Sequence, residues 1–311
     1  MTEPALETQN AVGGSSRDGP EFRPDLEGLR AVAVGLVLLY HAAVPGFAGG
    51  YIGVDVFFVL SGYLITGLLI RELRSTGRIS LPAFYARRAR RLLPAAAVTL
   101  LVTGLMSAIV LPPLRVSSVE SDIAAAAAYV SNMRFAFQAT NYLASELPPS
   151  PVLHFWSLGV EEQFYLLWPA ILILTTGAAF AAGNASRGLA RLGLVIATVF
   201  VGSAALSVWL TGVAQPWAFF TLPARAWELA LGALLALPAV ASRMPSRRGW
   251  LLGWTGIVIV TASGMLLSEQ TPFPGTAAFL PAVGSALVIA SGAGVPTARS
   301  GWLSSSAARF P

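Results

Sequence analysis

The sequence predicts an all-α, polytopic bundle of transmembrane helices. Of the 311 residues, 55% are hydrophobic and only 11% are charged, whereas a soluble domain carries about 25% charged residues. The mean hydropathy is +0.67. A disordered chain is rich in charge and poor in apolar residues. The composition therefore excludes both a soluble globular domain and a disordered chain.

Apolar intervals long enough to cross a bilayer recur along the chain. A spanning helix needs about 20 consecutive apolar residues, and charge-free intervals of that length recur along the chain. We predict eight spans, over residues 30–46, 52–70, 92–111, 156–180, 191–211, 217–237, 250–268 and 275–294.

The basic residues indicate the orientation of the bundle. All 20 are arginines, and 17 of them fall in segments that lie on one side of the membrane if the N-terminus is cytoplasmic. The exceptions are Arg115, Arg134 and Arg225. Cytoplasmic loops are enriched in basic residues, so we expect a cytoplasmic N-terminus. The same distribution explains the pI of about 10.1 without a nucleic-acid partner.

Two segments lie outside the predicted bundle core. Residues 1–21 are polar and rich in Gly and Ser, and we expect a flexible cytoplasmic tail, followed by one membrane domain over 22–311. The long external segment 112–155 contains an alanine-rich stretch, 119–137, that we predict as a helix. This helix is either interfacial or a ninth span. We place it outside, because an added span would invert all downstream loops.

Ionisable residues inside spans are costly and mark function by default. Arg30 and His41 are 11 residues apart, which at 100° per residue puts them on one face of a helix, about 16 Å apart along its axis. Imidazole titrates near neutral pH and suits a general base. The alternative is a structural histidine that bonds to a neighbouring helix.

Three further ionisable residues also fall inside predicted spans. Asp55 opens the second span after a short outer turn. It either orients His41 or interacts with the helix dipole. Arg225 and Glu228 are three residues apart, and we interpret them as a pair that neutralises itself.

The segment around the second histidine is unusual. If it is helical, His154, Glu161, Tyr165 and Trp168 share one face. Folding does not require two adjacent acids, Glu161 and Glu162, at the start of a span. We therefore favour a functional role for them over a structural one.

An arginine cluster ends the inner loop 71–91. Arg87 and Arg90, and Arg88 and Arg91, each have a spacing of three residues. They either control topology and bind anionic lipid or form two guanidinium pairs that clamp a pyrophosphate. The sequence has no cysteine, no histidine cluster with metal-site spacing, and no Gly-rich nucleotide loop. We expect no metal.

Five motifs, taken in order, resemble the acyltransferase-3 family of membrane-embedded O-acyltransferases. They are the run 22–34 followed by His41, the run 53–66, the arginine cluster before Leu92 and Pro94, the run 154–169 around the paired glutamates, and the run 225–229. The resemblance covers most of the chain. It implies a multi-pass protein of the bacterial plasma membrane.

The resemblance also implies a mechanism. Cytoplasmic acyl-CoA, with acetyl-CoA expected, is the co-substrate, and no tightly bound cofactor is needed. The acceptor is a hydroxyl of an extracytoplasmic glycan. We expect Arg87, Arg88, Arg90 and Arg91 to bind the CoA phosphates and Arg30 to bind the acyl arm. We expect His41 to act as the base together with Asp55, Glu161 and Glu162, and His154, Trp156 and Ser157 to contact the acceptor. The resemblance also implies that His154, Glu161 and Glu162 line the outer, acceptor side.

The chain departs from the family pattern at its end. Relatives continue beyond the position of Pro311 into a further helix, and some add an extracytoplasmic hydrolase-like domain, so we expect a C-terminally incomplete domain. Two other functions stay open. One is a proton-coupled transporter or flippase of a lipid-linked glycan, which the lack of a visible inverted repeat disfavours. The other is a non-catalytic sensor that binds acyl-CoA.

Overall fold

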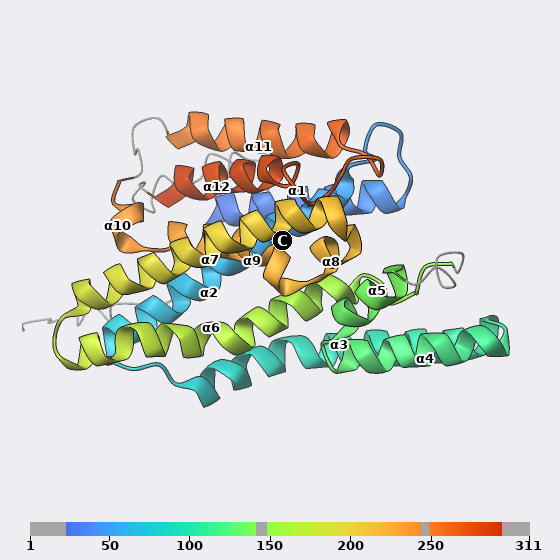
Figure 1. Cartoon of the computed structure of the whole chain (residues 1–311), viewed down its shortest axis with the longest axis horizontal. Helices are drawn as coiled ribbons and strands as arrows, with labels where there is room; N and C mark the ends of the chain where they lie inside the picture. The colour runs from blue at the N-terminus through green and yellow to red at the C-terminus, as the bar shows by residue number, and fades with distance from the viewer. Residues whose placement is uncertain (1–22, 141–147, 244–248, 294–311) are drawn as a thin grey trace, which may run out of the picture.

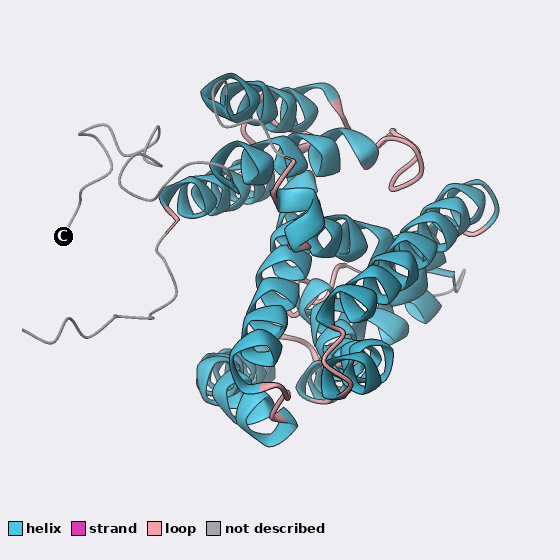
Figure 2. Ribbon diagram, turned by 90° about the vertical axis from the view of Figure 1, so that its left-hand side faces the viewer, coloured by secondary structure: helices cyan, strands magenta, loops and turns pink. Residues whose placement is uncertain are grey.

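The protein is a bundle of long helices (Figure 1). The computed structural model describes residues 23–140, 148–243 and 249–293. The predicted tail 1–21 lies outside the described residues, as does the end of the chain from 294 onward. Within the described ranges all regular structure is helical, as Figure 2 shows. The all-α prediction is confirmed.

Each of the eight predicted spans coincides with helical structure. The corresponding helices are α1 (Pro24–His41), α2 (Gly53–Thr76, after the short helix η1, Gly50–Ile52), α3 (Leu81–Val110), α6 (Phe155–Ala181), α7 (Ala185–Val213), α8 (Gln215–Phe220) with α9 (Leu222–Leu235), α11 (Gly249–Leu266) and α12 (Phe279–Ala293). A four-residue helix, α10 (Pro238–Ala241), follows α9.

Six helical segments in the described chain are long and apolar enough to cross a membrane. They are α2 with η1, α3, α6, α7, α8 with α9, and α11. The first helix, α1, has Asp25, Glu27 and Arg30 in its first two turns, and α12 has only 15 residues. The structure therefore supports a multi-pass membrane protein. The number of eight spans and the cytoplasmic N-terminus stay predictions.

The external segment differs from the single helix predicted over 119–137. It forms two helices, α4 (Pro113–Ala127) and α5 (Ser131–Thr140). The chain breaks at Tyr129, whose φ of 55° is incompatible with a continuous α-helix. A helix of 15 residues is about 22 Å long and is too short to span the hydrocarbon core. The two helices pack on α3 and α6 respectively.

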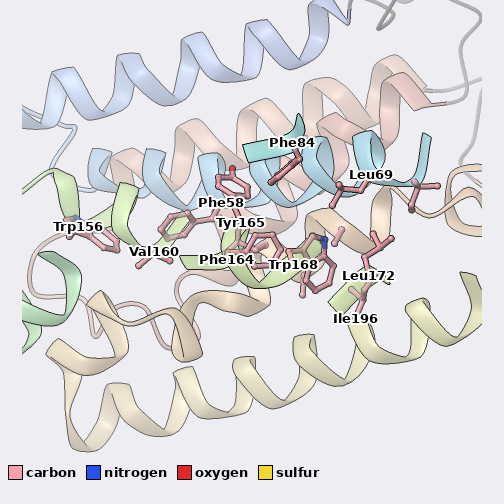
Figure 3. Packing of buried hydrophobic residues seen from close by; sticks show 14 of the residues in the cluster. Phe58, Leu69, Phe84, Trp156, Val160, Phe164, Tyr165, Trp168, Leu172 and Ile196 are labelled. Carbon is pink, nitrogen blue, oxygen red and sulfur yellow. The ribbon is translucent and has the colours of Figure 1, made fainter. Parts of the chain in front are cut away.

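Two clusters of buried side chains hold the bundle together, and α2 contributes to both. In the first cluster, aromatic rings of α6 pack beside Phe58 of α2, with Phe164 stacked on Trp168 (Figure 3). In the second cluster, Trp227 of α9 stacks on Phe279 of α12.

Two glycines bring α2 and α9 into backbone contact. A Cβ atom on Gly62 would overlap the main chain of Leu229, and one on Gly232 would overlap the main chain of Val59. Small residues at helix interfaces permit this close approach in membrane proteins. The contact fixes α9, which contains Arg225 and Glu228, against α2, which contains Asp55.

Candidate active site

A cavity of about 760 Å³ lies between α1, α2, α3 and α6. We call it the arginine cavity, because Arg30 of α1 and Arg88 and Arg91 of α3 line it. Glu161 and Tyr165 of α6 complete its polar wall. Its volume lies within the range of small-molecule sites, about 300–1,000 Å³.

Arg88 is the best-anchored arginine of this cavity. Its Nε donates to Oε1 of Glu162 at 2.7 Å, and its guanidinium lies 3.4 Å from the centre of the Tyr165 ring. Glu161 is close to the same guanidinium, with 3.8 Å between Oε2 and the Arg88 terminal nitrogen. Glu161 also accepts bonds from Ser61 (3.0 Å) and Tyr165 (3.2 Å). These contacts fix the guanidinium before any ligand arrives.

The structure separates the paired glutamates from His154, with which the sequence analysis groups them. Both contact Arg88 at the arginine cavity, whereas His154 lines a different cavity, described below. The physical reason is the rise of the helix. Seven residues of α-helix separate His154 from Glu161, which moves the carboxylate about 10 Å along the axis.

The structure places the two expected arginine pairs differently. Arg88 and Arg91 line the arginine cavity, whereas Arg87 and Arg90 do not. Arg87 lies 3.4 Å from Glu72, and Arg90 donates to the backbone oxygen of Ala86. One of the two i, i+3 pairs is therefore at the cavity, and the clamp itself stays a prediction. The third cavity arginine, Arg30, comes from α1, where it pairs with Glu27 at 2.6 Å.

A second cavity, of about 560 Å³, lies at the other end of α1. We call it the histidine cavity, because both histidines of the chain, His41 and His154, line it. Trp156 also lines it, as predicted for an acceptor residue. Ser157 does not, and its hydroxyl donates to the backbone oxygen of His154.

His41 has the geometry of a base. Its Nδ1 lies 2.8 Å from the carbonyl oxygen of Val37. A carbonyl oxygen only accepts, so Nδ1 carries the proton and donates it. In the neutral ring Nε2 then keeps a free lone pair. The local helix geometry thus selects the tautomer, and no carboxylate is needed to do so.

His154 directly precedes the first residue of α6. Partial desolvation, together with the nearby His41, lowers the pKa of His154 below its ordinary value, which favours the neutral imidazole. Its ring packs against Phe155, with 4.9 Å between the centroids. A neutral imidazole both donates and accepts a hydrogen bond, which suits contact with a hydroxyl ligand.

Asp55 does not orient His41. Its Oδ1 accepts from the Arg225 guanidinium at 3.0 Å, and the same arginine nitrogen donates to Glu228 at 2.8 Å. All three side chains are fully buried. Arg225 and Glu228 do pair as the sequence analysis expected, with Asp55 as a third member. A buried arginine between two carboxylates ties α9 to α2.

The buried Arg225 supports the histidine cavity from behind. Its guanidinium carbon lies 5.4–5.6 Å from the ring centres of Trp156, Phe219 and Phe273, which all line that cavity. Such distances are typical of cation–π contacts. The charged network thereby positions the aromatic wall of the site.

Three helices continue one face from the arginine cavity into the histidine cavity. On α1, Leu38 lines the first cavity, and His41, one turn further on, lines the second. On α2, Phe57 lines the first cavity and Val54 the second. On α6, Glu161 belongs to the first cavity and His154 to the second. The two cavities are therefore consecutive along the bundle.

The sequence analysis missed two polar residues of these cavities. Ser61, a polar residue in the apolar run 53–66, bonds Glu161, and its position in that run was an available signal. Glu269 accepts from Tyr40 at 2.9 Å in the histidine cavity. It lies in the loop between α11 and α12, and only the tertiary structure brings it there. Among the described residues, no group of three potential metal ligands converges.

Comparison with known proteins identifies the family. A family model described as an acyltransferase domain matches residues 23–309. The chain belongs to the acyltransferase-3 family. This is the family that the five sequence motifs resemble. No solved structure matches the chain significantly.

Curated relatives within or near this family are named O-acetyltransferases. A peptidoglycan O-acetyltransferase of Listeria monocytogenes is 42% identical over 160 residues, which is 51% of this chain and 26% of that protein. A putative peptidoglycan O-acetyltransferase of Bacillus subtilis is 35% identical over 229 residues, 73% of this chain and 35% of that protein. A putative O-acetyltransferase of Staphylococcus aureus is 45% identical over 152 residues, 49% of this chain and 25% of that protein. The matched segments thus span about a quarter to a third of these relatives.

Proposed function

We propose that the protein is a membrane O-acyltransferase of the bacterial plasma membrane. It transfers an acetyl group from cytoplasmic acetyl-CoA to a hydroxyl of an extracytoplasmic cell-wall polysaccharide. The observation that carries this proposal is the pair of consecutive cavities, with arginines at one end and His41 at the other. The names of the relatives support the acetyl group and the polysaccharide acceptor.

The arginine cavity receives the donor. Arg30, Arg88 and Arg91 supply three guanidinium groups around one opening, and planar guanidinium forks match phosphate oxygens. Within the part of the chain that the structure describes, no acidic side chain forms an ion pair with Arg91, so this residue offers its charge directly to a phosphate. The acyl end of the donor points along α1 toward His41.

The histidine cavity receives the acceptor. Its wall combines aromatic rings, among them Tyr51 and Trp156, with the polar side chains of Gln215 and Glu269. Sugar rings have apolar faces and polar edges, and such a wall matches both. A carbohydrate hydroxyl that reaches Nε2 of His41 lies at the point where the two cavities approach one another.

His41 then acts as base and acid in turn. Its Nε2 takes the proton of the acceptor hydroxyl while the hydroxyl oxygen attacks the thioester carbonyl carbon. The carbon–sulfur bond breaks, and the CoA thiolate takes up the proton from the imidazolium. The products are the acetyl ester and CoA thiol, so His41 returns neutral and no other reactant is needed.

The test measures transfer of labelled acetyl groups. Membranes that contain the full chain receive radiolabelled acetyl-CoA and soluble peptidoglycan fragments, and ester-bound label in the fragments is counted. His41→Gln is expected to lower transfer by about 10²-fold or more, the usual contribution of a general base. The exposed Arg187→Ala on α7 is the matched control and should retain transfer.

Two results would contradict the proposal. Full transfer by His41→Gln would remove His41 from the chemistry. Movement of a lipid-linked glycan across the membrane without consumption of acetyl-CoA would favour the transporter instead.

A further inference from the structure

A third cavity, of about 380 Å³, lies beneath α4 and α5. We call it the α4–α5 cavity. Arg115, Asp122 and Gln138 provide its main polar groups, and Phe135 and Phe220 provide aromatic surface. None of these residues takes part in the proposed chemistry.

The α4–α5 cavity adjoins the histidine cavity. Four residues line both of them: Pro149, Ser150, Leu153 and Phe220. Three of the four belong to the short segment that leads into α6. This segment is therefore a partition with one cavity on each side, and a ligand that crosses it occupies both.

We propose that the α4–α5 cavity is a second acceptor subsite, which binds a neighbouring sugar unit of a polymeric acceptor while the reacting unit lies beside His41. This inference rests on the proposed function. On this inference the enzyme binds at least two sugar units of the polysaccharide rather than a single sugar.

The polar groups of the cavity are arranged for a neutral ligand with hydroxyl groups. Asp122 is buried, and its Oδ1 accepts from Arg134 Nε at 2.6 Å and from Gln138 Nε2 at 2.9 Å. Both bonds go to the same oxygen, and among the described residues no side chain donates to Oδ2, whose lone pairs face a ligand hydroxyl. The Arg134 guanidinium neutralises the charge of this carboxylate, so Asp122 contributes hydrogen-bond acceptors rather than net charge to the cavity.

The other walls complete the match to a sugar. Arg115 donates to the backbone oxygen of Pro148 at 3.0 Å, which holds its guanidinium at the rim with further N–H groups free to donate. The Phe135 and Phe220 rings, 6.3 Å apart, offer apolar surface to the face of a sugar ring.

The experiment fills the cavity and measures binding without catalysis. The probes are N-acetylglucosamine and its β-1,4-linked tetramer, titrated against the detergent-solubilised full chain. Wild type should bind the tetramer at least about tenfold more tightly than the monomer, the effect of one or two added hydrogen bonds. Ser118→Trp places a large ring in the cavity, because Ser118 lines it, and should abolish the difference.

The adjacent serine is the matched control. Ser117 is exposed and does not line the cavity, so Ser117→Trp should keep the tetramer preference. Arg115→Gln, a smaller change at the rim, should reduce it by several-fold. The proposal is overturned if wild type binds both probes equally, or if Ser118→Trp binds the tetramer as wild type does.

Binding and transfer fail separately. If the tetramer preference depends on Ser118 but no acetyl group is transferred under any condition, the proposed function fails and the subsite remains as a glycan-binding site. If transfer occurs but the preference is absent or insensitive to Ser118→Trp, the subsite fails and the proposed function remains.

Discussion

The two histidines differ in the contacts that hold them. His41 is fixed by a bond from its own Nδ1 to the preceding turn of α1, which leaves Nε2 free. His154 is exposed, and its ring packs against Phe155. The same residue type therefore has different surroundings at the two positions, and we propose different roles for them.

The coupling between the histidines predicts a shift in titration. Removal of the His41 imidazole by His41→Asn takes away one of the two causes that lower the pKa of His154, so that pKa should rise toward the ordinary value. Since the chain has only two histidines, the variant shows a single imidazole resonance in an NMR titration. A His154 pKa identical in the two proteins would show that the coupling is absent.

Arg88 and Arg87 are neighbours in sequence with different surroundings. Arg88 lines the arginine cavity and Arg87 pairs with Glu72 outside it. We expect Arg88→Ala to raise the KM for acetyl-CoA about tenfold or more, since a hydrogen bond to a charged group contributes about 1.5–3 kcal/mol. Arg87→Ala is the matched control and should leave the KM within twofold. Equal effects of the two substitutions would contradict the assignment.

At the scale of the helices, the contact between α2 and α9 organises the site. Gly62 and Gly232 allow these helices to touch along their backbones, and the buried ion pairs of Arg225 then join them. Asp55 and Arg225 are 170 residues apart in the chain. Helix periodicity predicts each helix but not which helices touch, so this contact could not be predicted from the sequence.

The glycine contact predicts a large difference between two similar substitutions. In Gly62→Ala the new Cβ overlaps the main chain of Leu229, whereas in Gly67→Ala the nearest atom beyond its own helix is 3.9 Å away. Overpacking costs about 1–3 kcal/mol, so Gly62→Ala should lower the thermal unfolding temperature in detergent. Gly67→Ala should keep or raise it, because alanine favours helix by about 1 kcal/mol over glycine. A Gly62→Ala protein as stable as wild type would exclude the close contact.

The external helices show where sequence patterns fail. The alanines of the stretch 119–137 have high helix propensity, which favours one continuous helix. The chain instead breaks at Tyr129, and α4 packs on α3 whereas α5 packs on α6. Ser131, with which α5 begins, is a residue type that favours helix N-termini, but the alanine content outweighed this signal in the prediction.

At the scale of the whole molecule, the sequence predicted most of the architecture. The eight apolar segments all lie on helices, and His41, Arg30, Arg88 and Arg91 line the two central cavities. The position of each remaining site residue along its helix was harder to predict. Glu161 and Glu162 lie too far along α6 to line the histidine cavity, and Arg87 and Arg90 do not line the arginine cavity.

The orientation of the bundle is testable, because the chain contains no cysteine. Single cysteines are introduced at two exposed serines, Ser75 at the end of α2 and Ser117 in α4. If the N-terminus is cytoplasmic, a membrane-impermeant maleimide added to intact cells should label Ser117→Cys and spare Ser75→Cys. Both should react in opened membranes. The reverse pattern in intact cells would invert the topology and exchange the two cavities.

The apolar residues between the two cavities have a consequence for the energy supply of the cell. On α1, Val34 and Leu38 separate Arg30 from His41, and on α2, Phe57 separates Ser61 from Val54. A chain of water molecules needs polar partners at each step, and these stretches offer few. We therefore expect that protons do not leak between the two cavities, even where the proposed acetyl transfer takes place. Cells that make the protein should then keep their membrane potential during the proposed modification of the cell wall.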